Sequence, residues 1–287
     1  MDLFQAIFMG IVQGLSEFLP ISSSGHLVFS SNIYKFINGI ELTVESNQEI
    51  FLDIMLHLGT LIAVFIFFRK EIWQILKALY LACAKKEYNK EDFNLGLYII
   101  LGTIITVLIA FPLKDLASAI VFKPIVVSIL LIFTGVLLLF SENFSKKFVE
   151  KKDLDLKTSI LMAVAQGLAA LPGFSRSGLT IATGLLAGAE RNKVARYSFL
   201  LSIPIILGAS MFYPILTFDF KEIAGFNWFV IIIGTVVSGI VGYFCIKYFL
   251  KFVSKFSLAV FGWYCIILGL IMTTIFYYIR GVAYYGA

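Results

Sequence analysis

The stretch SEFLPISSSGHL (residues 16–27) places a glutamate, three consecutive serines and a histidine inside an otherwise apolar region. The apolar pieces on its two sides have about 12 to 17 residues each, and helices of that length are too short to cross the roughly 30 Å hydrocarbon layer. We therefore expect residues 2–36 to form a re-entrant helix pair, which enters the membrane, turns at this stretch and returns to the same side.

The rest of the chain has the composition of a helical membrane protein. Of its 287 residues, 60% are hydrophobic and 14% are charged, and the mean hydropathy is +0.93. A soluble domain of this length needs more polar surface. The predicted fold class is an all-α polytopic membrane protein with six transmembrane helices. The predicted spans are residues 51–68, 95–112, 121–140, 197–217, 228–248 and 257–279.

A second interrupted apolar region, residues 158–190, resembles the first. GIVQGLSEFLPISSSG (residues 10–25) aligns with AVAQGLAALPGFSRSG (residues 163–178) at a constant offset of 153 residues, apart from a one-residue slip of the prolines. Each region precedes three predicted spans, and because three is an odd number the two halves have opposite orientations. We expect two inverted-topology repeats, and such repeats with broken helices place a polar site near the bilayer midplane.

One membrane domain therefore covers residues 1–287. Its first half spans about residues 1–141 and its second half about residues 158–280, because each half begins with an interrupted region and ends after three spans. A basic linker at about residues 142–157 joins them.

Basic residues are distributed unevenly between the two sides of this layout. Seventeen lysines and arginines fall in connections on one side, at residues 69–90, 146–157, 191–196 and 247–255. The positive-inside rule assigns that side to the cytoplasm. We expect both termini and the first re-entrant pair on the outer side, and we expect no nucleic-acid partner. The outer side then holds Lys35, Lys114, Lys123, Lys221, Arg280, Glu41, Glu45 and Glu49.

Three ionisable residues lie at the two predicted tips, where a charge costs roughly 2.5–3.5 kcal/mol on insertion scales. The first tip supplies Glu17 and His26, and the second supplies Arg176. A guanidinium is suited to binding a phosphate with two parallel hydrogen bonds. A structural ion pair between Arg176 and Glu17 is the alternative.

Gln13 and Glu17 are four residues apart and share one helix face. Their side-chain oxygens could hold a hard divalent cation that shares the phosphate oxygens of a ligand. Glu17 could also act as a general acid or base. The alternative is helix packing, because Gly10 and Gly14 form a GxxxG motif on a neighbouring face.

Ser22, Ser23 and Ser24 begin the return helix, and at least one of them is expected to be its N-cap. A helix N-terminus also binds anions through its free N–H groups and its dipole. Ser23 and His26 should share a face, which places a hydroxyl beside a base or a second nucleophile. The second tip repeats this cradle without the histidine. The residues that complete the two cradles are Gly25, Ser175, Ser177, Gly178 and Thr180.

His57 is the only other histidine and lies about two turns into the first full span from its outer end. It could line the outer approach to the site or pack between helices.

The motifs QGLSEFLPISSSGH and PGFSRSGLT together resemble the signatures of the undecaprenyl-diphosphate phosphatase family of bacitracin-resistance proteins. The resemblance extends over the whole chain. It implies hydrolysis of undecaprenyl diphosphate, or a similar isoprenyl diphosphate lipid, to the monophosphate and inorganic phosphate in the bacterial inner membrane. The product is the lipid carrier of peptidoglycan synthesis.

By motif position, the resemblance makes Gln13 and Glu17 the acidic-motif pair, Ser23 the nucleophile, His26 the acid, base or alternative nucleophile, and Arg176 the phosphate clamp. It also implies a divalent cation, Mg²⁺ or Ca²⁺. Many members have glutamate where this chain has Gln13, which puts metal ligation by both positions in doubt. A homodimer is left open.

A transporter or flippase for an isoprenyl phosphate lipid is the strongest competing function, because inverted repeats with broken helices are common in transporters. A carrier needs the phosphate-binding arginine but has no use for the set of Glu17, Ser23 and His26. A purely structural scaffold leaves the charges within the membrane unexplained.

Overall fold

The computed structural model describes residues 2–39, 46–146 and 152–285, and it is helical throughout these ranges apart from turns and one isolated β-bridge. Six helical segments are long and apolar enough to cross a membrane, as predicted. Their bounds are α3 (Asn47–Phe67), Lys90–Val121, α7 (Pro124–Ser145), α10 (Arg191–Thr217), α12 (Trp228–Val253) and α13 (Ala259–Tyr285). The protein is therefore a multi-pass membrane protein.

The second of these segments is not a single helix. It consists of α5 (Lys90–Ala110), the 3₁₀ turn η1 (Phe111–Leu113) and α6 (Lys114–Val121). Pro112 lies in the 3₁₀ turn, and a proline lacks the N–H group that a continuous helix requires.

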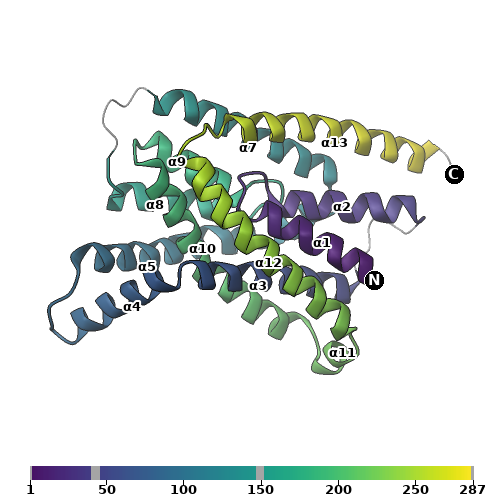
Figure 1. Cartoon of the computed structure of the whole chain (residues 1–287). Helices are drawn as coiled ribbons and strands as arrows, with labels where there is room; N and C mark the ends of the chain where they lie inside the picture. Colours follow the sequence, from purple (N-terminus) through teal and green to yellow (C-terminus); the bar gives the residue numbers. More distant parts are fainter. Residues whose placement is uncertain (1, 40–45, 147–151, 286–287) are drawn as a thin grey trace.

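The two interrupted regions each form two short helices joined by a turn. The first contains α1 (Leu3–Ser16) and α2 (Ser23–Ile37), and the second contains α8 (Leu156–Leu168) and α9 (Arg176–Leu186). Both turns lie at the centre of the molecule, and the two chain termini lie at the same end (Figure 1). Glu41, Glu45, Lys147 and Lys151, which the charge analysis assigns to the two sides, fall outside the described residues.

The segment after α3 differs from expectation. Residues 69–94 were expected to form only a connection, but they include the helix α4 (Arg69–Cys83). Its buried residues, Ile75 and Ala78, lie on one face, and α4 packs against α5. Basic residues made the segment too polar for a span, although its apolar spacing suits an amphipathic helix.

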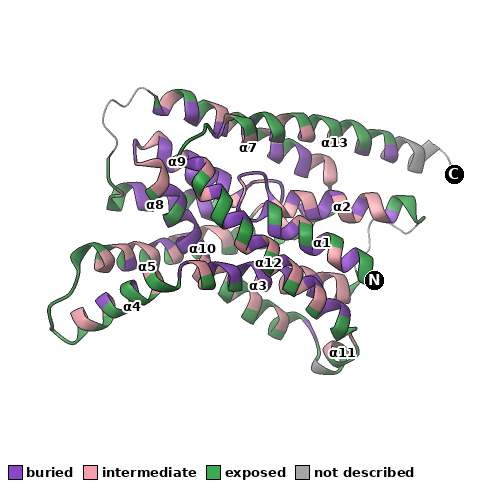
Figure 2. Ribbon diagram, in the orientation of Figure 1, coloured by how far each residue is buried: buried purple, intermediate pink, exposed green. Residues whose placement is uncertain are grey.

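The packing of the helices follows the repeat. Helix α1 packs against α12, and α8, its counterpart in the second half, packs against α5. The remaining long pairs are α3 with α12 and α7 with α13. Buried residues line the short helices at the centre, whereas α4 and α13 show exposed faces (Figure 2). The most buried part of the molecule therefore surrounds the two turns.

A buried ion pair fixes one end of this bundle. Glu142 on α7 is 2% exposed and receives two hydrogen bonds from Arg191 at the start of α10. It also accepts the backbone N–H of Leu258, which precedes α13, at 2.9 Å. The carboxylate therefore joins three segments, and removing either charge would leave the other buried without a partner.

A substitution at Gly59 tests the close approach of α3 to α12. A Cβ atom at this position would overlap the carbonyl oxygen of Thr235 and lie 3.2 Å from the amide nitrogen of Gly239. We expect Gly59→Ala to destabilise the protein by roughly 1–3 kcal/mol, because backbone atoms cannot move aside as a flexible side chain can. Gly208→Ala in α10 is the matched control, since a Cβ there meets nothing within 4 Å. Unfolding of both variants in detergent, followed by circular dichroism, measures the difference; equal stability would contradict the packing described.

Candidate active site

The turns of the two interrupted helices contact each other directly. The hydroxyl of Ser177, in the second half, donates to the carbonyl oxygen of Leu19 at 3.0 Å. The backbone N–H of Gly173, also in the second half, donates to the hydroxyl of Ser24 at 3.4 Å. Ser24 and Ser177 are equivalent positions of the sequence repeat, and each bonds to the turn of the opposite half. The two predicted tips therefore form one structure.

Equivalent serines cap the two return helices. Ser22 is the N-cap of α2, and its hydroxyl accepts the N–H of Gly25 at 3.1 Å. Ser175 is the N-cap of α9, and its hydroxyl accepts the N–H of Gly178 at 3.0 Å. The expectation that one of the three consecutive serines caps its helix is confirmed for Ser22. The N-termini of α2 and α9 meet at the two turns. The positive ends of both helix dipoles therefore face the region between the turns.

Ser22 has an unusual backbone conformation. Its φ of 70° lies in the left-handed region, which a residue other than glycine adopts at a cost. Its side chain is 1% exposed and is held by the contacts of the cap. The turn therefore fixes the direction in which the next residue, Ser23, points.

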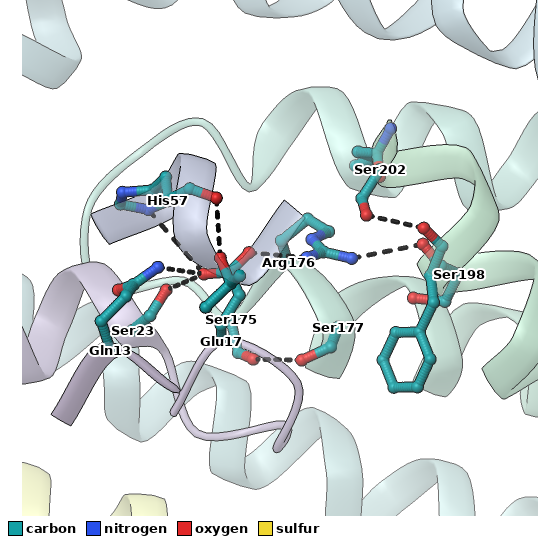
Figure 3. A network of polar contacts seen from close by, with 12 residues as sticks. Gln13, Glu17, Ser23, His57, Ser175, Arg176, Ser177, Ser198 and Ser202 are labelled. Atoms are coloured by element: carbon teal, nitrogen blue, oxygen red, sulfur yellow. Dashed lines mark hydrogen bonds and ion pairs between the residues drawn. The ribbon is translucent and has the colours of Figure 1, made fainter. Parts of the chain in front are cut away.

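The carboxylate of Glu17 is the centre of the polar network at the turns (Figure 3). Its Oε1 accepts a hydrogen bond from Nη2 of Arg176 at 2.7 Å. Its Oε2 accepts one from the hydroxyl of Ser23 at 2.6 Å and one from Nε2 of Gln13 at 3.0 Å. The structural ion pair considered above therefore exists, and a serine hydroxyl shares it. Glu17 itself is only 7% exposed.

A second layer of contacts orients Arg176. Its Nη1 donates to the carbonyl oxygen of Ser198 on α10 at 3.2 Å, on the side away from Glu17. The hydroxyl of Ser198 lies 2.6 Å from that of Thr180, which also donates to the carbonyl of Arg176. Thr180 therefore bonds to the backbone of Arg176 and to Ser198, away from the turns. No sequence pattern indicated Ser198.

His57 stands beside the network. Its Nε2 lies 3.8 Å from Oε2 of Glu17, and its Nδ1 lies 2.8 Å from the carbonyl oxygen of Asp53. His57 and Ser24 also line a cavity of ≈ 460 Å³ that extends toward Glu49 at the start of α3. His57 therefore lines a cavity beside Glu17, and its role at the approach to the site stays a prediction.

His26 differs from expectation in its contacts. Its Nδ1 lies 2.8 Å from the carbonyl oxygen of Ser22, and its Nε2 lies 2.8 Å from the hydroxyl of Tyr264 on α13. The two rings are nearly parallel, with centroids 5.8 Å apart. The hydroxyl of Ser23 does not bond to His26 but to Glu17. The imidazole of His26 is held by the carbonyl oxygen of Ser22, one helical turn before it. A catalytic role of His26 therefore stays a prediction.

One oxygen of the Glu17 network has no hydrogen-bond donor within the described part of the chain. Among the residues that the structure describes, Oε1 of Gln13 accepts no hydrogen bond, and Gln13 is 0% exposed. A buried acceptor without a donor is costly and suggests a ligand. Within the described ranges no group of three or more His, Cys, Asp or Glu side chains converges, so a cage made only of such ligands is not formed there.

Comparison with known proteins now identifies the family. The family model described as Bacitracin resistance protein BacA matches residues 6–271. The chain belongs to the BacA family. A protein of Halothermothrix orenii named Undecaprenyl-diphosphatase is 39% identical over 262 residues, which cover 91% of this chain and 93% of that protein. A protein of the same name from Methanosphaera stadtmanae is 38% identical over 272 residues, covering 91% and 93%.

The BacA match agrees with the resemblance read from the motifs. A third similar protein, from Alteromonas mediterranea and also named Undecaprenyl-diphosphatase, is 36% identical over 258 residues, or 90% of this chain and 92% of that protein. The matched range, residues 6–271, includes both turns and every labelled residue of the Glu17 network in Figure 3.

Proposed function

We propose that the protein hydrolyses undecaprenyl diphosphate to undecaprenyl phosphate and inorganic phosphate, as the names of its relatives indicate. The observation that carries the proposal is the contact of Glu17 with both Ser23 and Arg176. It joins a proton acceptor, a hydroxyl and a guanidinium in one buried cluster. A carrier that only binds phosphate has no need for a hydroxyl bonded to a carboxylate.

The proposed arrangement in the membrane is two re-entrant helix pairs in inverted-topology repeats. The sequence repeat, the mirrored caps and the reciprocal bonds between the turns support it. In this arrangement the turns lie near the bilayer midplane, and the cavity leads from them to the outer side of the bacterial inner membrane. An isoprenyl diphosphate can reach such a site from the outer leaflet because its tail stays in lipid.

Glu17 acts as the general base in the proposed reaction. The attacking oxygen is that of Ser23 or of a water molecule bonded to Glu17, and in both routes its proton passes to the carboxylate. A bond forms from this oxygen to the terminal phosphorus, and the anhydride P–O bond breaks to release undecaprenyl phosphate. In the serine route, water then hydrolyses the phosphoserine to inorganic phosphate and restores the hydroxyl.

Arg176 and the two helix N-termini stabilise the charge of the phosphates. Phosphoryl transfer depends mainly on positioning and on electrostatic stabilisation of the equatorial oxygens. The Arg176 guanidinium has five N–H donors, and its contacts with Glu17 and Ser198 use two of them. In the proposed reaction, the other N–H donors of Arg176 bind the phosphate. All of these residues belong to one chain, so the chemistry requires no second copy.

The residues present fit a divalent cation that is shared with the substrate. Gln13 would supply its unpartnered Oε1, and Glu17 has lone pairs beyond those that its three donors occupy. Mg²⁺ usually binds through one or two protein oxygens plus phosphate oxygens and waters, and Ca²⁺ also takes only oxygen ligands but a larger number of them. When bound, such an ion would neutralise charge on the diphosphate.

Gln13→Ala should raise the Mg²⁺ or Ca²⁺ concentration for half-maximal activity about 10- to 100-fold, because one oxygen ligand is lost. EDTA should abolish phosphate release by the wild type, and the added ion should restore it. Gln166→Ala is the matched control, since Gln166 is the repeat equivalent but bonds to Thr106 and to the carbonyl of Leu201, outside the Glu17 network. Activity that is indifferent to EDTA would remove the metal from this account.

Cysteine labelling in intact cells tests the orientation. In a Cys83→Ser background, Cys245 and Cys265 are buried, so a single introduced cysteine reports its own side. We expect a membrane-impermeant maleimide to label Glu222→Cys, near the end where the termini lie. It should label Lys86→Cys, at the opposite end, only after the cells are opened. The reverse pattern would invert the proposed topology.

Phosphate release by the purified protein tests the function itself. Incubated with undecaprenyl diphosphate in nanodiscs, the protein should yield inorganic phosphate and undecaprenyl phosphate in equal amounts. Movement of the intact lipid between leaflets without phosphate release would favour a carrier.

A further inference from the structure

The cavity beside the active site is longer and more apolar than a diphosphate requires. Its inner end is formed by His57 and Ser24, and Glu49 and Asp53 lie toward its outer end. Between them the walls come from α1, α2, α3, α6 and α10 and consist mainly of aliphatic and aromatic side chains. The apolar wall residues from α2, from α6 with its C-cap Phe122, and from α10 include Leu27, Val28, Val121, Ile205, Ile206 and Ala209.

The cavity lies between α6 and α10, and each of these helices packs against other helices. Helix α6 packs against α7, whereas α10 packs against α3, α5, α9 and α12. Both line the cavity, α6 through Ser118, Val121 and its C-cap Phe122 and α10 through residues between 205 and 213. Phe122 is 46% exposed and Tyr213 is also 46% exposed, so this part of the wall reaches the surface of the molecule.

The part of α10 along the cavity has weakened helical hydrogen bonding. Pro204 and Pro214 lie inside the helix and lack the N–H groups that would bond to the preceding turn. Gly208 lies between them, and a Cβ there would meet open space. In Figure 1 this half of α10 runs below α3 toward α11 (Phe220–Ala224). Of the cavity walls, this part of α10 is therefore the one that can move with the fewest helical hydrogen bonds broken.

We propose that the isoprenyl chain of the substrate leaves the active site between α6 and the outer half of α10. The inference rests on the proposed function and adds the route of the tail. The diphosphate lies at the Glu17 network, and the first isoprene units contact the apolar walls of the cavity. The rest of the chain passes between Phe122 and Tyr213 into the lipid. Ala209 on α10 lines the cavity along this passage.

Three features select a hydrocarbon chain as the occupant. The cavity ends at His57 and Ser24, and His57 Nε2 lies 3.8 Å from Oε2 of Glu17, so the cavity lies next to the proposed phosphate-binding end. Its walls between the two ends are apolar, which suits a chain of methyl and methylene groups. A substrate that stays in the bilayer also needs a lateral opening, because its tail cannot cross water without loss of hydrophobic stabilisation.

Photo-crosslinking tests the route directly. An isoprenyl diphosphate that carries a diazirine on its third isoprene unit is bound to the full-length protein in nanodiscs, irradiated, and mapped by mass spectrometry. We expect labels on α6 and on α10 between residues 205 and 213. Labels on the apolar groove between α3 and α12, lined by Gly59, Ile62, Val236 and Gly239, would overturn the proposal.

A tryptophan substitution supplies the functional arm. Ala209→Trp should lower the labelling of α6 and α10 and lower kcat/KM for undecaprenyl diphosphate about tenfold, which equals about 1.4 kcal/mol. Met211→Trp is the matched control, because Met211 is 55% exposed on the same helix and does not line the cavity. An unchanged Ala209→Trp variant would contradict the route.

Phosphate release by the wild type separates the two proposals. Release together with labels outside α6 and α10 would refute the tail route alone. Absence of release, with or without labels, would refute the proposed function on which the route rests.

Discussion

Glu17→Gln lowers phosphate release by the purified protein about 10²–10⁴-fold in this account, the range expected for loss of a general base. Glutamine keeps the size and hydrogen-bonding reach of the side chain but cannot accept the proton of Ser23. It also leaves Arg176 without its anionic partner at 2.7 Å. The loss should fall on kcat rather than on KM, because proton transfer contributes only in the transition state. Steady-state measurement of both constants checks the split.

Glu222→Gln is the matched control for this substitution. Glu222 is an exposed acid on α11, and it bonds to Asn47 rather than to the active-site network. Its neutralisation should leave kcat within about twofold, because surface substitutions away from a site are usually small in effect. A Glu17→Gln variant that retained comparable activity would exclude Glu17 as the base.

Arg176→Lys should lower kcat/KM about 10²–10³-fold, a loss similar to removal of one preorganised donor in other enzymes. Lysine keeps the charge but has a single ammonium group, which cannot bond to Glu17, the carbonyl of Ser198 and a phosphate in the fixed fork geometry of arginine. Because the charge is retained, the variant should fold. Measurement of kcat/KM with undecaprenyl diphosphate gives the loss.

Arg176→Met separates catalysis from folding. It leaves Glu17 buried without its cation and should destabilise the protein by about 3–5 kcal/mol. The double variant Glu17→Gln/Arg176→Met removes both charges and should regain much of that stability while staying inactive. Activity of Arg176→Met within about fivefold of the wild type would contradict the assignment of the arginine to the phosphate, whatever its stability.

The sequence predicted the spans and the place of the site because both depend on patterns along the chain. Hydropathy located all six spans, since a membrane requires a long apolar run wherever a helix crosses it. The internal repeat located the second turn, and ionisable residues near both turns indicated that the turns meet. Glu17 and Arg176 contact each other across these turns, although they are 159 residues apart and are not equivalent positions of the repeat.

Partners chosen by packing between helices could not be predicted in the same way. Tyr264 is 238 residues from His26 and shows no motif, and its hydroxyl is nevertheless the partner of the imidazole. Ser198 orients Arg176 through a backbone carbonyl, which any residue carries. Spacing placed Ser23 and His26 on one face, but the turn at Ser22 directed the hydroxyl toward Glu17. Such contacts depend on rotamers and helix positions, which hydropathy does not encode.

A structure of the protein with undecaprenyl methylenediphosphonate, in which carbon replaces the bridging oxygen that is cleaved, tests the central claim most directly. We expect the terminal phosphonate to contact the Arg176 guanidinium from one half and the Ser23 hydroxyl from the other. A diphosphonate bound to only one turn, or away from both, would contradict a single site shared by the two halves.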